Sequence, residues 1–373
     1  MKSVTNENIM ILKARDFVKE QVVPSIEEFE RNAFIPKEFF IKMAKHGFLG
    51  LSIPKKYGGL ELDYLTLGAI HEEFGKGYCS VQNILTVYAM VCKPLNRFGT
   101  EDQKQKWLPA IAKGETIVSI AITEPKAGSD IKQIETEAVL DGDDYVINGK
   151  KRYITLGQIA DLFLVFGKCN GRGIAFLVER ETPGFEIHPI NGLLGLRANM
   201  LAELHLKNCR IPKENLIGRV GHGLSHVATF ALDEGRYTTA CGCVGLGQAC
   251  LEEAFKYAED RIQFNSPIRE HQLVQKMLTE MIVNVKAARL LCHDAGMLRD
   301  AADPSSIAAT LMAKYYASKM SVMVSNYAVQ IHGASGCVAG AAVERFYRDS
   351  KIMEIIEGAS QLYEIHIAKN FRI

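Results

Sequence analysis

Glu357 is the residue of this sequence best placed to do chemistry, because its acidic side chain stands between apolar residues and a glycine. Two isoleucines precede it and Gly358 follows it. A carboxylate in such surroundings loses part of its hydration, which raises its affinity for protons. That property suits a general base that removes a weakly acidic C–H proton. The alternative interpretation is the start of a helix, with Glu364 and Lys369 on its solvated face.

The turn between Thr123 and Asp130 is a second candidate site. Thr123 and Ser129 supply hydroxyl groups, Gly128 supplies a hinge, and several backbone N–H groups are exposed in the turn. Groups of this kind bind a polar heterocycle or an oxyanion without a strong charge. The alternative is an ordinary Asx-type or Ser-type turn that leaves a strand.

Other well-known chemical motifs are missing from the sequence. There is no glycine-rich dinucleotide motif after a strand, no phosphate-binding loop and no protease or hydrolase motif. The nine cysteines are scattered, and no Cys/His group has zinc spacing, so we expect no metal site and reduced, buried thiols. The glycine-rich stretch 242–247 lies in a helical pattern, which favours close helix packing.

Composition excludes several classes of protein. The 373 residues are 47% hydrophobic and 23% charged with a formal net charge of +1, as in an ordinary globular protein of two or three domains. This charge predicts no binding to nucleic acid. No apolar run approaches the roughly 18–20 residues that span a bilayer, so we expect no membrane insertion. The polar start, residues 1–8, does not look like a secretion signal, and we expect a cytoplasmic protein.

The hydrophobic pattern divides the chain into three zones that would position these residues. Residues 1–117 are predicted to form an N-terminal helical domain, in which Thr100 caps a helix. Residues 118–217 alternate as short strands and predict a small β-barrel or sandwich, with a hairpin turn at Asn148-Gly149. Residues 218–373 return to long helical segments at 249–261, 271–299 and 305–331, which predict a helical bundle. The fold class is therefore α+β.

Six segments in this order resemble the acyl-CoA dehydrogenase family, and the resemblance covers nearly the whole chain. The segments are Thr123-Glu124-Pro125 with Ala127-Gly128-Ser129-Asp130, Asn148 to Thr155, Pro212 to Asn215, Arg261 with Phe264, Gln330-Ile331 with Gly333, and Arg348-Asp349 with Lys351 and Glu357-Gly358. The family's fold is a helical domain, a β domain and a four-helix domain, as the three zones predict independently.

The resemblance implies FAD as the cofactor, bound between the β domain and the C-terminal helices. The residues that match flavin contacts in the same chain are Thr123, Ser129, Tyr153, Thr155 and Gln361. Those that match contacts to the FAD of a neighbouring subunit are Arg261, Phe264, Gln330 and Gly333. The family therefore implies a homo-oligomer, at least a dimer and usually a tetramer.

The resemblance also implies α,β-dehydrogenation of an acyl thioester. Glu357 would take the α-proton while flavin N5 accepts the β-hydride, and Ser129, Arg236 and Gly358 would contact the substrate. The backbone N–H of Glu357 would polarise the thioester carbonyl. Some relatives carry the base at the position of Gly235, which has no side chain. Its neighbour Glu234 would point about 100° away on a helix.

Several choices stay open in the sequence. The thioester is either acyl-CoA or an acyl group on a carrier protein, as in relatives of secondary metabolism, and electron-transfer flavoprotein is a possible electron acceptor. Ala359, Asn265 and Ala334 depart from the family pattern at flavin or glycine positions. The alternatives are an oxidase or monooxygenase in which the flavin reacts with O2, a non-catalytic flavoprotein that binds nucleic acid, and a purely structural helical protein.

Overall fold

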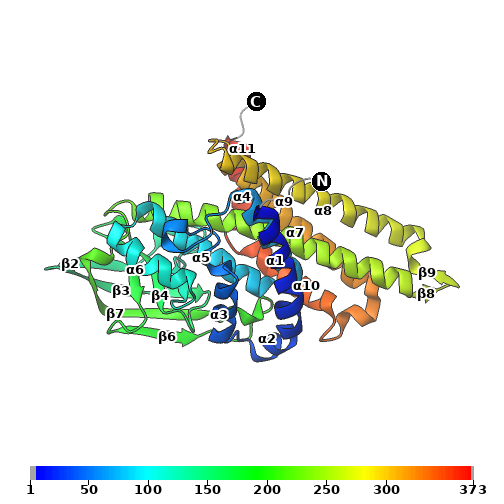
Figure 1. Cartoon of the computed structure of the whole chain (residues 1–373), viewed down its shortest axis with the longest axis horizontal. Coiled ribbons are helices and arrows are strands. Elements are labelled where there is room, and N and C mark those ends of the chain that lie inside the picture. The colour runs from blue at the N-terminus through cyan, green and yellow to red at the C-terminus, as the bar shows by residue number, and fades with distance from the viewer. Residues whose placement is uncertain (1–5, 371–373) are drawn as a thin grey trace.

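Helices at both ends of the chain enclose a central curled sheet in this computed structural model, which describes residues 6–370 (Figure 1). The α+β class and the order of helices, strands and helices are confirmed. Residues 1–5, on which the expectation about a secretion signal partly rests, lie outside the described residues.

The N-terminal part is built from six α-helices. They are α1 (Asn6–Phe17), α2 (Ile26–Asn32), α3 (Lys37–Lys45), α4 (Tyr64–Gly77), α5 (Cys79–Phe98) and α6 (Glu101–Ala112). The predicted cap is confirmed, because Thr100 and Gln103 form a reciprocal capping box at the start of α6. Helix α5 is buried along nearly its whole length, so it forms the centre of the packing between the two ends of the chain.

The middle part is a seven-stranded sheet. Its strands are β1 (Val118–Ala121), β2 (Glu137–Asp141), β3 (Asp144–Ile154), β4 (Leu162–Cys169), β5 (Arg172–Glu179), β6 (Phe185–Pro189) and β7 (Ala202–Pro212). The order is β1-β4-β2-β3-β7-β6, and β5 pairs with the other edge of β4. The change from helix to strand falls between Ala112 and Val118, while the domain boundaries proposed above remain a prediction.

The predicted hairpin turn at Asn148-Gly149 is wrong. Both residues lie inside β3, where the register with β7 shifts. The chain turns instead at Gly142, which has φ of 65° and joins β2 to β3. A glycine is needed at position 149 because β3 passes close to Thr136 there, and a Cβ on Gly149 would lie 2.3 Å from Oγ1 of Thr136. The Asn-Gly pair therefore marks an irregularity within a strand rather than its end.

The C-terminal part consists of α7 (Thr229–Asp260), α8 (Gln272–Asp300), α9 (Ser306–His332), α10 (Ala342–Ile355) and α11 (Ser360–Asn370), with a small hairpin of β8 (Ile262–Gln263) and β9 (Ser266–Pro267). Helix α7 starts earlier than predicted and contains the glycine-rich stretch. A Cβ on Gly245 would lie 2.0 Å from the carbonyl oxygen of Glu72, and one on Gly75 would lie 2.3 Å from that of Gly242. The expected close helix packing is confirmed, because α4 and α7 meet backbone against backbone.

The structure shows the state of the cysteines and the character of the long helices. All nine cysteines are free thiols, but Cys337 is exposed while the other eight are buried. Across residues 6–370, no helix is both long and apolar enough to cross a membrane.

Candidate functional site

Glu357 lies in the turn that joins α10 to α11. Its φ is 61° and that of Gly358 is 119°, so two successive residues adopt left-handed or similarly unusual backbone conformations. The carbonyl oxygen of Glu357 accepts hydrogen bonds from the hydroxyl of Tyr363 and, at 3.4 Å, from Nε of Arg236. These bonds fix the turn in a conformation that costs free energy locally.

The carboxyl group of Glu357 lies against Gly235 of α7 and the sulfur of Met90 in α5. A Cβ on Gly235 would lie 2.4 Å from Oε2 of Glu357 and 2.7 Å from Sδ of Met90. Oε2 is buried and has no hydrogen-bond partner within the described part of the chain. Burial raises the pKa of Glu357 from 4.5 to about 7, although the nearby charges of Arg236 and Lys314 act in the opposite direction. The sequence indicated this direction.

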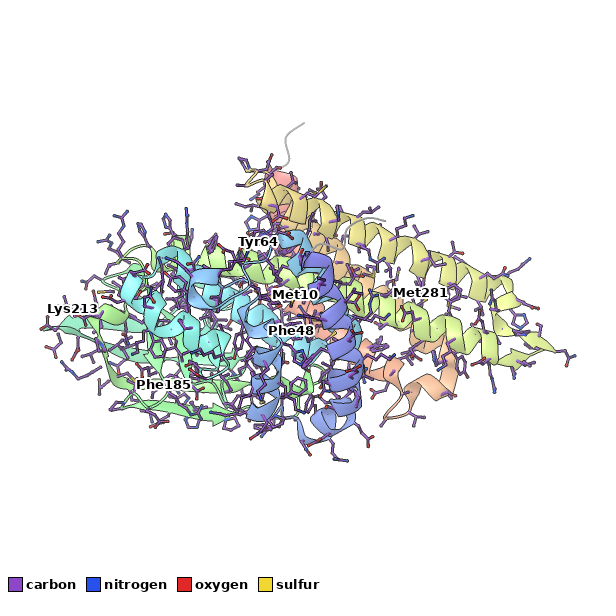
Figure 2. All side chains as sticks on the ribbon, in the orientation of Figure 1. Met10, Phe48, Tyr64, Phe185, Lys213 and Met281 are labelled. Atoms are coloured by element: carbon purple, nitrogen blue, oxygen red, sulfur yellow. The ribbon has the colours of Figure 1, made fainter. Side chains whose placement is uncertain are left out.

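Glu234 points away from Glu357, as its position on the helix predicted. The fully buried carboxylate accepts hydrogen bonds of 2.6 Å from the hydroxyl of Tyr64 and from Arg299. Nζ of Lys93 lies 3.2 Å from the same hydroxyl. Tyr64 stands at the start of α4, close beneath α8 (Figure 2), where its N–H donates to Asp300. We call Tyr64, Lys93, Glu234 and Arg299 the Glu234 cluster.

A second buried polar group lies between α4, α5 and α7. Nε2 of Gln82 is 3.0 Å from the hydroxyl of Thr86, from the carbonyl oxygen of Thr238 and from Nδ1 of His71. The hydroxyls of Thr86 and Thr238 are 3.0 Å apart. All four residues are fully buried, and burial lowers the pKa of His71 to about 3. We call them the Gln82 cluster.

The structure brings together the flavin candidates of the β domain. The N–H of Arg152, beside Tyr153, donates to the carbonyl oxygen of Thr123, and Ser119 donates to that of Thr155 at 2.6 Å. Tyr153 is 55% exposed next to these polar groups, and the guanidinium of Arg152 lies 5.1 Å from the centroid of its ring. Ser129 is also exposed, in the turn after Thr123.

A buried ion pair anchors that turn. Nζ of Lys151 in β3 lies 2.7 Å from Oε1 of Glu124 and 3.1 Å from the carbonyl oxygen of Ile122. Glu124 also accepts hydrogen bonds from the N–H groups of Glu135 and Thr136. Burial lowers the pKa of Lys151 to about 8, while the charge of Glu124 partly restores it. The pair ties the Thr123 turn to the strand that carries Tyr153 and thereby positions both.

The candidates that match contacts to a neighbouring subunit lie elsewhere. Arg261, Phe264, Gln330 and Gly333 are exposed near the β8–β9 hairpin and the end of α9. In Figure 1 this hairpin lies at the opposite end of the molecule from the sheet. Phe264 is 92% exposed. Gln361 is exposed at the start of α11, close in sequence to Glu357.

The loop before β7 connects the sheet to α10. Leu196 donates its N–H to Asp349 at 2.7 Å, and Arg348 donates to the carbonyl oxygen of Leu194 at 3.0 Å. A Cβ on Gly195 would lie 2.5 Å from the carbonyl oxygen of Arg348. Burial raises the pKa of Asp349 to about 7, although its bond from Leu196 acts in the opposite direction. These contacts set the position of α10, and so of Glu357, relative to the β domain.

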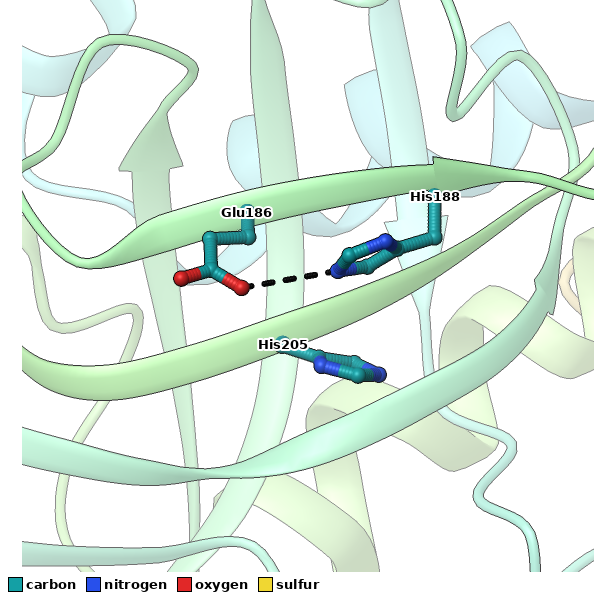
Figure 3. Close-up of side chains that lie close together, drawn as sticks. All are labelled: Glu186, His188 and His205. Atoms are coloured by element: carbon teal, nitrogen blue, oxygen red, sulfur yellow. Dashed lines mark ion pairs between the residues drawn. The ribbon is translucent and has the colours of Figure 1, made fainter.

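A group of potential metal ligands lies on the face of β6 and β7 (Figure 3). The ligand atoms of Glu186, His188 and His205 lie within 4.8 Å of one another. No spacing in the sequence marks this group, because strand register, which sets Glu186 opposite His205, brings it together. These side chains already have partners, since Lys207 donates to Glu186 at 2.8 Å and His205 lies 2.7 Å from Glu203.

Three family models match consecutive parts of the chain. The models are the acyl-CoA dehydrogenase N-terminal domain over residues 5–115, the middle domain over 119–209 and the C-terminal domain over 221–371. Together they cover the described helices, the sheet and the turn that carries Glu357.

Individual relatives are similar over almost the whole length. Acryloyl-CoA reductase (NADH) of Anaerotignum propionicum is 36% identical, with 98% of this chain and 95% of the relative covered. The mitochondrial short-chain specific acyl-CoA dehydrogenase of Rattus norvegicus is 37% identical, with coverage of 95% and 87%. The crystal structure of a prolyl acyl carrier protein oxidase is 30% identical, covers 98% of both chains and has a TM-score of 0.92.

Proposed function

The chain belongs to the acyl-CoA dehydrogenase family, and on this premise we propose that it dehydrogenates an acyl thioester between the α- and β-carbons with bound FAD. The family consists of oxidoreductases that act on CH–CH groups, so the enzyme class is settled. The base, the cofactor and the substrate are the proposal.

The observation that carries the proposal is the carboxyl group of Glu357. Its Oε2 is buried and has no partner among the described residues, and burial raises its pKa to about 7. A carboxylate near that pKa is available as a base at neutral pH and still accepts a proton readily. Gly235 supports the assignment, because a side chain there would occupy the space of the carboxyl group.

The β-domain residues fit a flavin. Thr123, Tyr153 and Thr155 come from adjacent segments and offer hydroxyls, backbone groups and an exposed aromatic side chain. Neutral donors of this kind suit a polar ring system, and Gly128 adds open space in the neighbouring turn. Bound FAD would supply the acceptor for the β-hydride.

The backbone around Glu357 is prepared for a developing negative charge. Its carbonyl oxygen is occupied by Tyr363 and Arg236, whereas its N–H donates to no other group in residues 6–370. This N–H is free to donate to the thioester carbonyl as charge accumulates on that oxygen. Arg236, on the next position of α7 after Gly235, holds the turn in place and keeps a positive charge beside it.

The decisive test is Glu357→Gln in the flavin-loaded enzyme. We expect the variant to keep its flavin but to reduce it at least about 10²-fold more slowly on addition of an acyl thioester, because the positioned proton transfer is lost. Stopped-flow absorbance of the flavin measures this rate. Glu354→Gln is the matched control, since Glu354 is a nearby acid whose carboxylate pairs with Lys351. Fast reduction of the Glu357 variant would contradict the assignment.

A second candidate is the reverse reaction, reduction of a 2-enoyl thioester. It is favoured by the 36% identity to acryloyl-CoA reductase and by a pKa of about 7, at which Glu357 is half protonated at neutral pH. In that direction Glu357 would give its proton to the α-carbon. Supplying the enzyme with an enoyl thioester and a reduced electron donor tests it, and mass spectrometry detects the gain of two hydrogens.

Separate assays are needed for the group that carries the acyl chain, CoA or carrier protein, and for the electron acceptor. The similarity to a prolyl acyl carrier protein oxidase favours comparing CoA and carrier-protein thioesters of the same acyl group. Reoxidation by electron-transfer flavoprotein and by O2 is measured in parallel. Rapid release of peroxide would favour the oxidase alternative.

For the assembled enzyme, we propose that Arg261, Phe264, Gln330 and Gly333 contact the FAD of a neighbouring subunit. Their place at the end opposite the sheet supports this, because one chain does not bring them to its own flavin candidates (Figure 1). Ser129, Arg236, Gly358 and Gln361 stay proposed contacts to substrate or flavin.

A further inference from the structure

We propose that the acyl group bound beside Glu357 is short, and that the hydrogen bond between Thr86 and Thr238 sets the limit of its length. The inference rests on the proposed function and names the substrate class of the same site. The limit follows from the two buried polar clusters, the Gln82 cluster and the Glu234 cluster, that lie on either side of the contact between Met90 and Gly235.

One face of α5 meets α7 at this contact. Thr86, Met90 and Lys93 follow one another at the i, i+4 and i+7 positions, so they lie on the same face of α5. On α7, Gly235 and Thr238 are three residues apart and also share a face. Met90 is the one apolar member of this α5 row, and its sulfur is the atom that faces Gly235 and Glu357.

The Gln82 cluster closes one direction along α5. The hydroxyls of Thr86 and Thr238 bridge the two helices at 3.0 Å, and Gln82 is hydrogen-bonded to both residues. Four residues of an α-helix span about 6 Å, which is the distance from Met90 to this bridge along the axis. An apolar chain that reaches farther must separate the two hydroxyls, which are fully buried and have no access to water.

The Glu234 cluster closes the other direction. Lys93 lies about 4.5 Å along the axis from Met90, and its ammonium group is 3.2 Å from the hydroxyl of Tyr64. That hydroxyl is in turn bonded to the buried carboxylate of Glu234, which pairs with Arg299. An apolar chain gains nothing from contact with these groups and would disrupt a buried ion pair.

Between the threonine bridge and the Glu234 cluster, Met90 is the residue that α5 places beside the base, so the apolar stretch of this wall reaches about one helical turn in either direction. An acyl group of about three to five carbons fits within the ~6 Å between Met90 and the threonine bridge. A longer group breaks the bond from Thr86 to Thr238, so the buried Thr86 hydroxyl loses its acceptor, whereas Thr238 keeps its bond to the carbonyl oxygen of Glu234. One buried donor without an acceptor lowers kcat/KM by a factor of about 5 to 150.

The test is a chain-length series on the flavin-loaded enzyme. Saturated acyl-CoA esters of three to sixteen carbons serve as probes, and we expect kcat/KM to fall at least about tenfold between butyryl-CoA and octanoyl-CoA. In the Thr86→Ala/Thr238→Ala double variant, the octanoyl-to-butyryl ratio of kcat/KM should rise at least about tenfold. If the double variant does not fold, Thr86→Ala alone replaces it, and the same ratio should rise.

Two controls separate length selection from general damage. Thr86→Ser keeps the hydroxyl and should keep the wild-type ratio. Ser321→Ala removes another fully buried hydroxyl, one that donates to Ser318 within α9, and should also leave the ratio unchanged. Flavin absorbance confirms cofactor content in every variant.

The outcomes distinguish the two proposals. If wild-type enzyme oxidises octanoyl-CoA or palmitoyl-CoA as efficiently as butyryl-CoA, the length limit is overturned while the proposed function stands. An unchanged ratio in the double variant overturns the role of the threonine bridge. If no ester reduces the flavin, the proposed function fails, and calorimetric binding of the same series still tests the limit, since short esters should bind more tightly than long ones.

Discussion

Glu357 gains its chemical character from burial, and two nearby cations moderate it. Arg236 and Lys314 both favour its charged form, yet burial is the larger influence and the pKa rises to about 7. Lys314 is itself fully buried and donates to the carbonyl oxygens of Met353 and Glu354, so its charge is fixed at the end of α10. The base is therefore tuned by charges from two helices, α7 and α9.

This pKa predicts the pH profile of the proposed oxidation. Only the deprotonated carboxylate accepts the α-proton, so kcat/KM should rise with pH and level off above about 7. In the opposite direction the protonated form is needed, and the rate of enoyl reduction should fall through the same pH. Steady-state rates between pH 5 and pH 9 check both. A rising limb near 4.5 would show that the carboxyl group is solvated.

Gly235 gives a second prediction at this scale. Gly235→Ala adds a Cβ that would lie 2.4 Å from Oε2 of Glu357, so the carboxylate must move away. A displacement of about 1 Å costs roughly 10²-fold in rate, so kcat should fall by about that factor while flavin content stays unchanged. Rapid reduction kinetics measure the loss. Gly142→Ala is the control for a destabilising substitution away from the site, because φ of 65° strains an alanine in this open turn, and its rate should stay unchanged. An unaffected Gly235→Ala rate would argue against the packing of Gly235 on Glu357.

Among the elements, those with a local signal were predictable from the sequence. The capping box at Thr100 and the helical pattern around the glycines of α7 depend on neighbouring residues, and both were confirmed. The Asn148-Gly149 turn failed because the same dipeptide also serves a strand irregularity that faces Thr136. The Gln82 and Glu234 clusters were missed because their members come from three and four different helices, respectively. Such members lie far apart in the sequence, as Tyr64 and Arg299 do, so no local pattern links them.

The anchor of the Thr123 turn yields a prediction for the sheet. Lys151→Met leaves the carboxylate of Glu124 buried without its partner, so the free energy of unfolding should fall by about 3–5 kcal/mol. Urea unfolding followed by circular dichroism measures it. The control is Lys126→Met, which removes an exposed pair with Glu135 and should cost about 0–1 kcal/mol. Equal losses in the two variants would mean that the buried pair is not an anchor.

The whole molecule separates two sets of flavin candidates. One set lies on the sheet and the other near the β8–β9 hairpin, at opposite ends (Figure 1). Phe264 is 92% exposed in the single chain, which is the exposure expected of a residue that the proposed neighbouring subunit would cover. The sequence indicated this only through the family resemblance, because contacts between chains leave no periodicity in the sequence.

Phe264 tests this arrangement. In Phe264→Ala the loss of one aromatic contact should weaken FAD binding about three- to tenfold, although the residue is remote from the sheet of its own chain. Flavin release on ultrafiltration measures affinity, and analytical ultracentrifugation follows the oligomer. Phe34→Ala, which shortens another exposed aromatic residue, should change neither. Unaltered flavin affinity in the Phe264 variant would place the neighbouring cofactor elsewhere.

The backbone contact between α4 and α7 has a consequence for how this enzyme can diversify. Where Gly75 meets Gly242 and Gly245 meets Glu72, α7 offers no side chain that could shrink or rearrange. Helix α5, by contrast, faces α7 with Met90 and Thr86, whose replacement changes volume without moving a helix. Selection for a new substrate, in nature or in the laboratory, should therefore leave its substitutions on α5 and spare the glycines of α7.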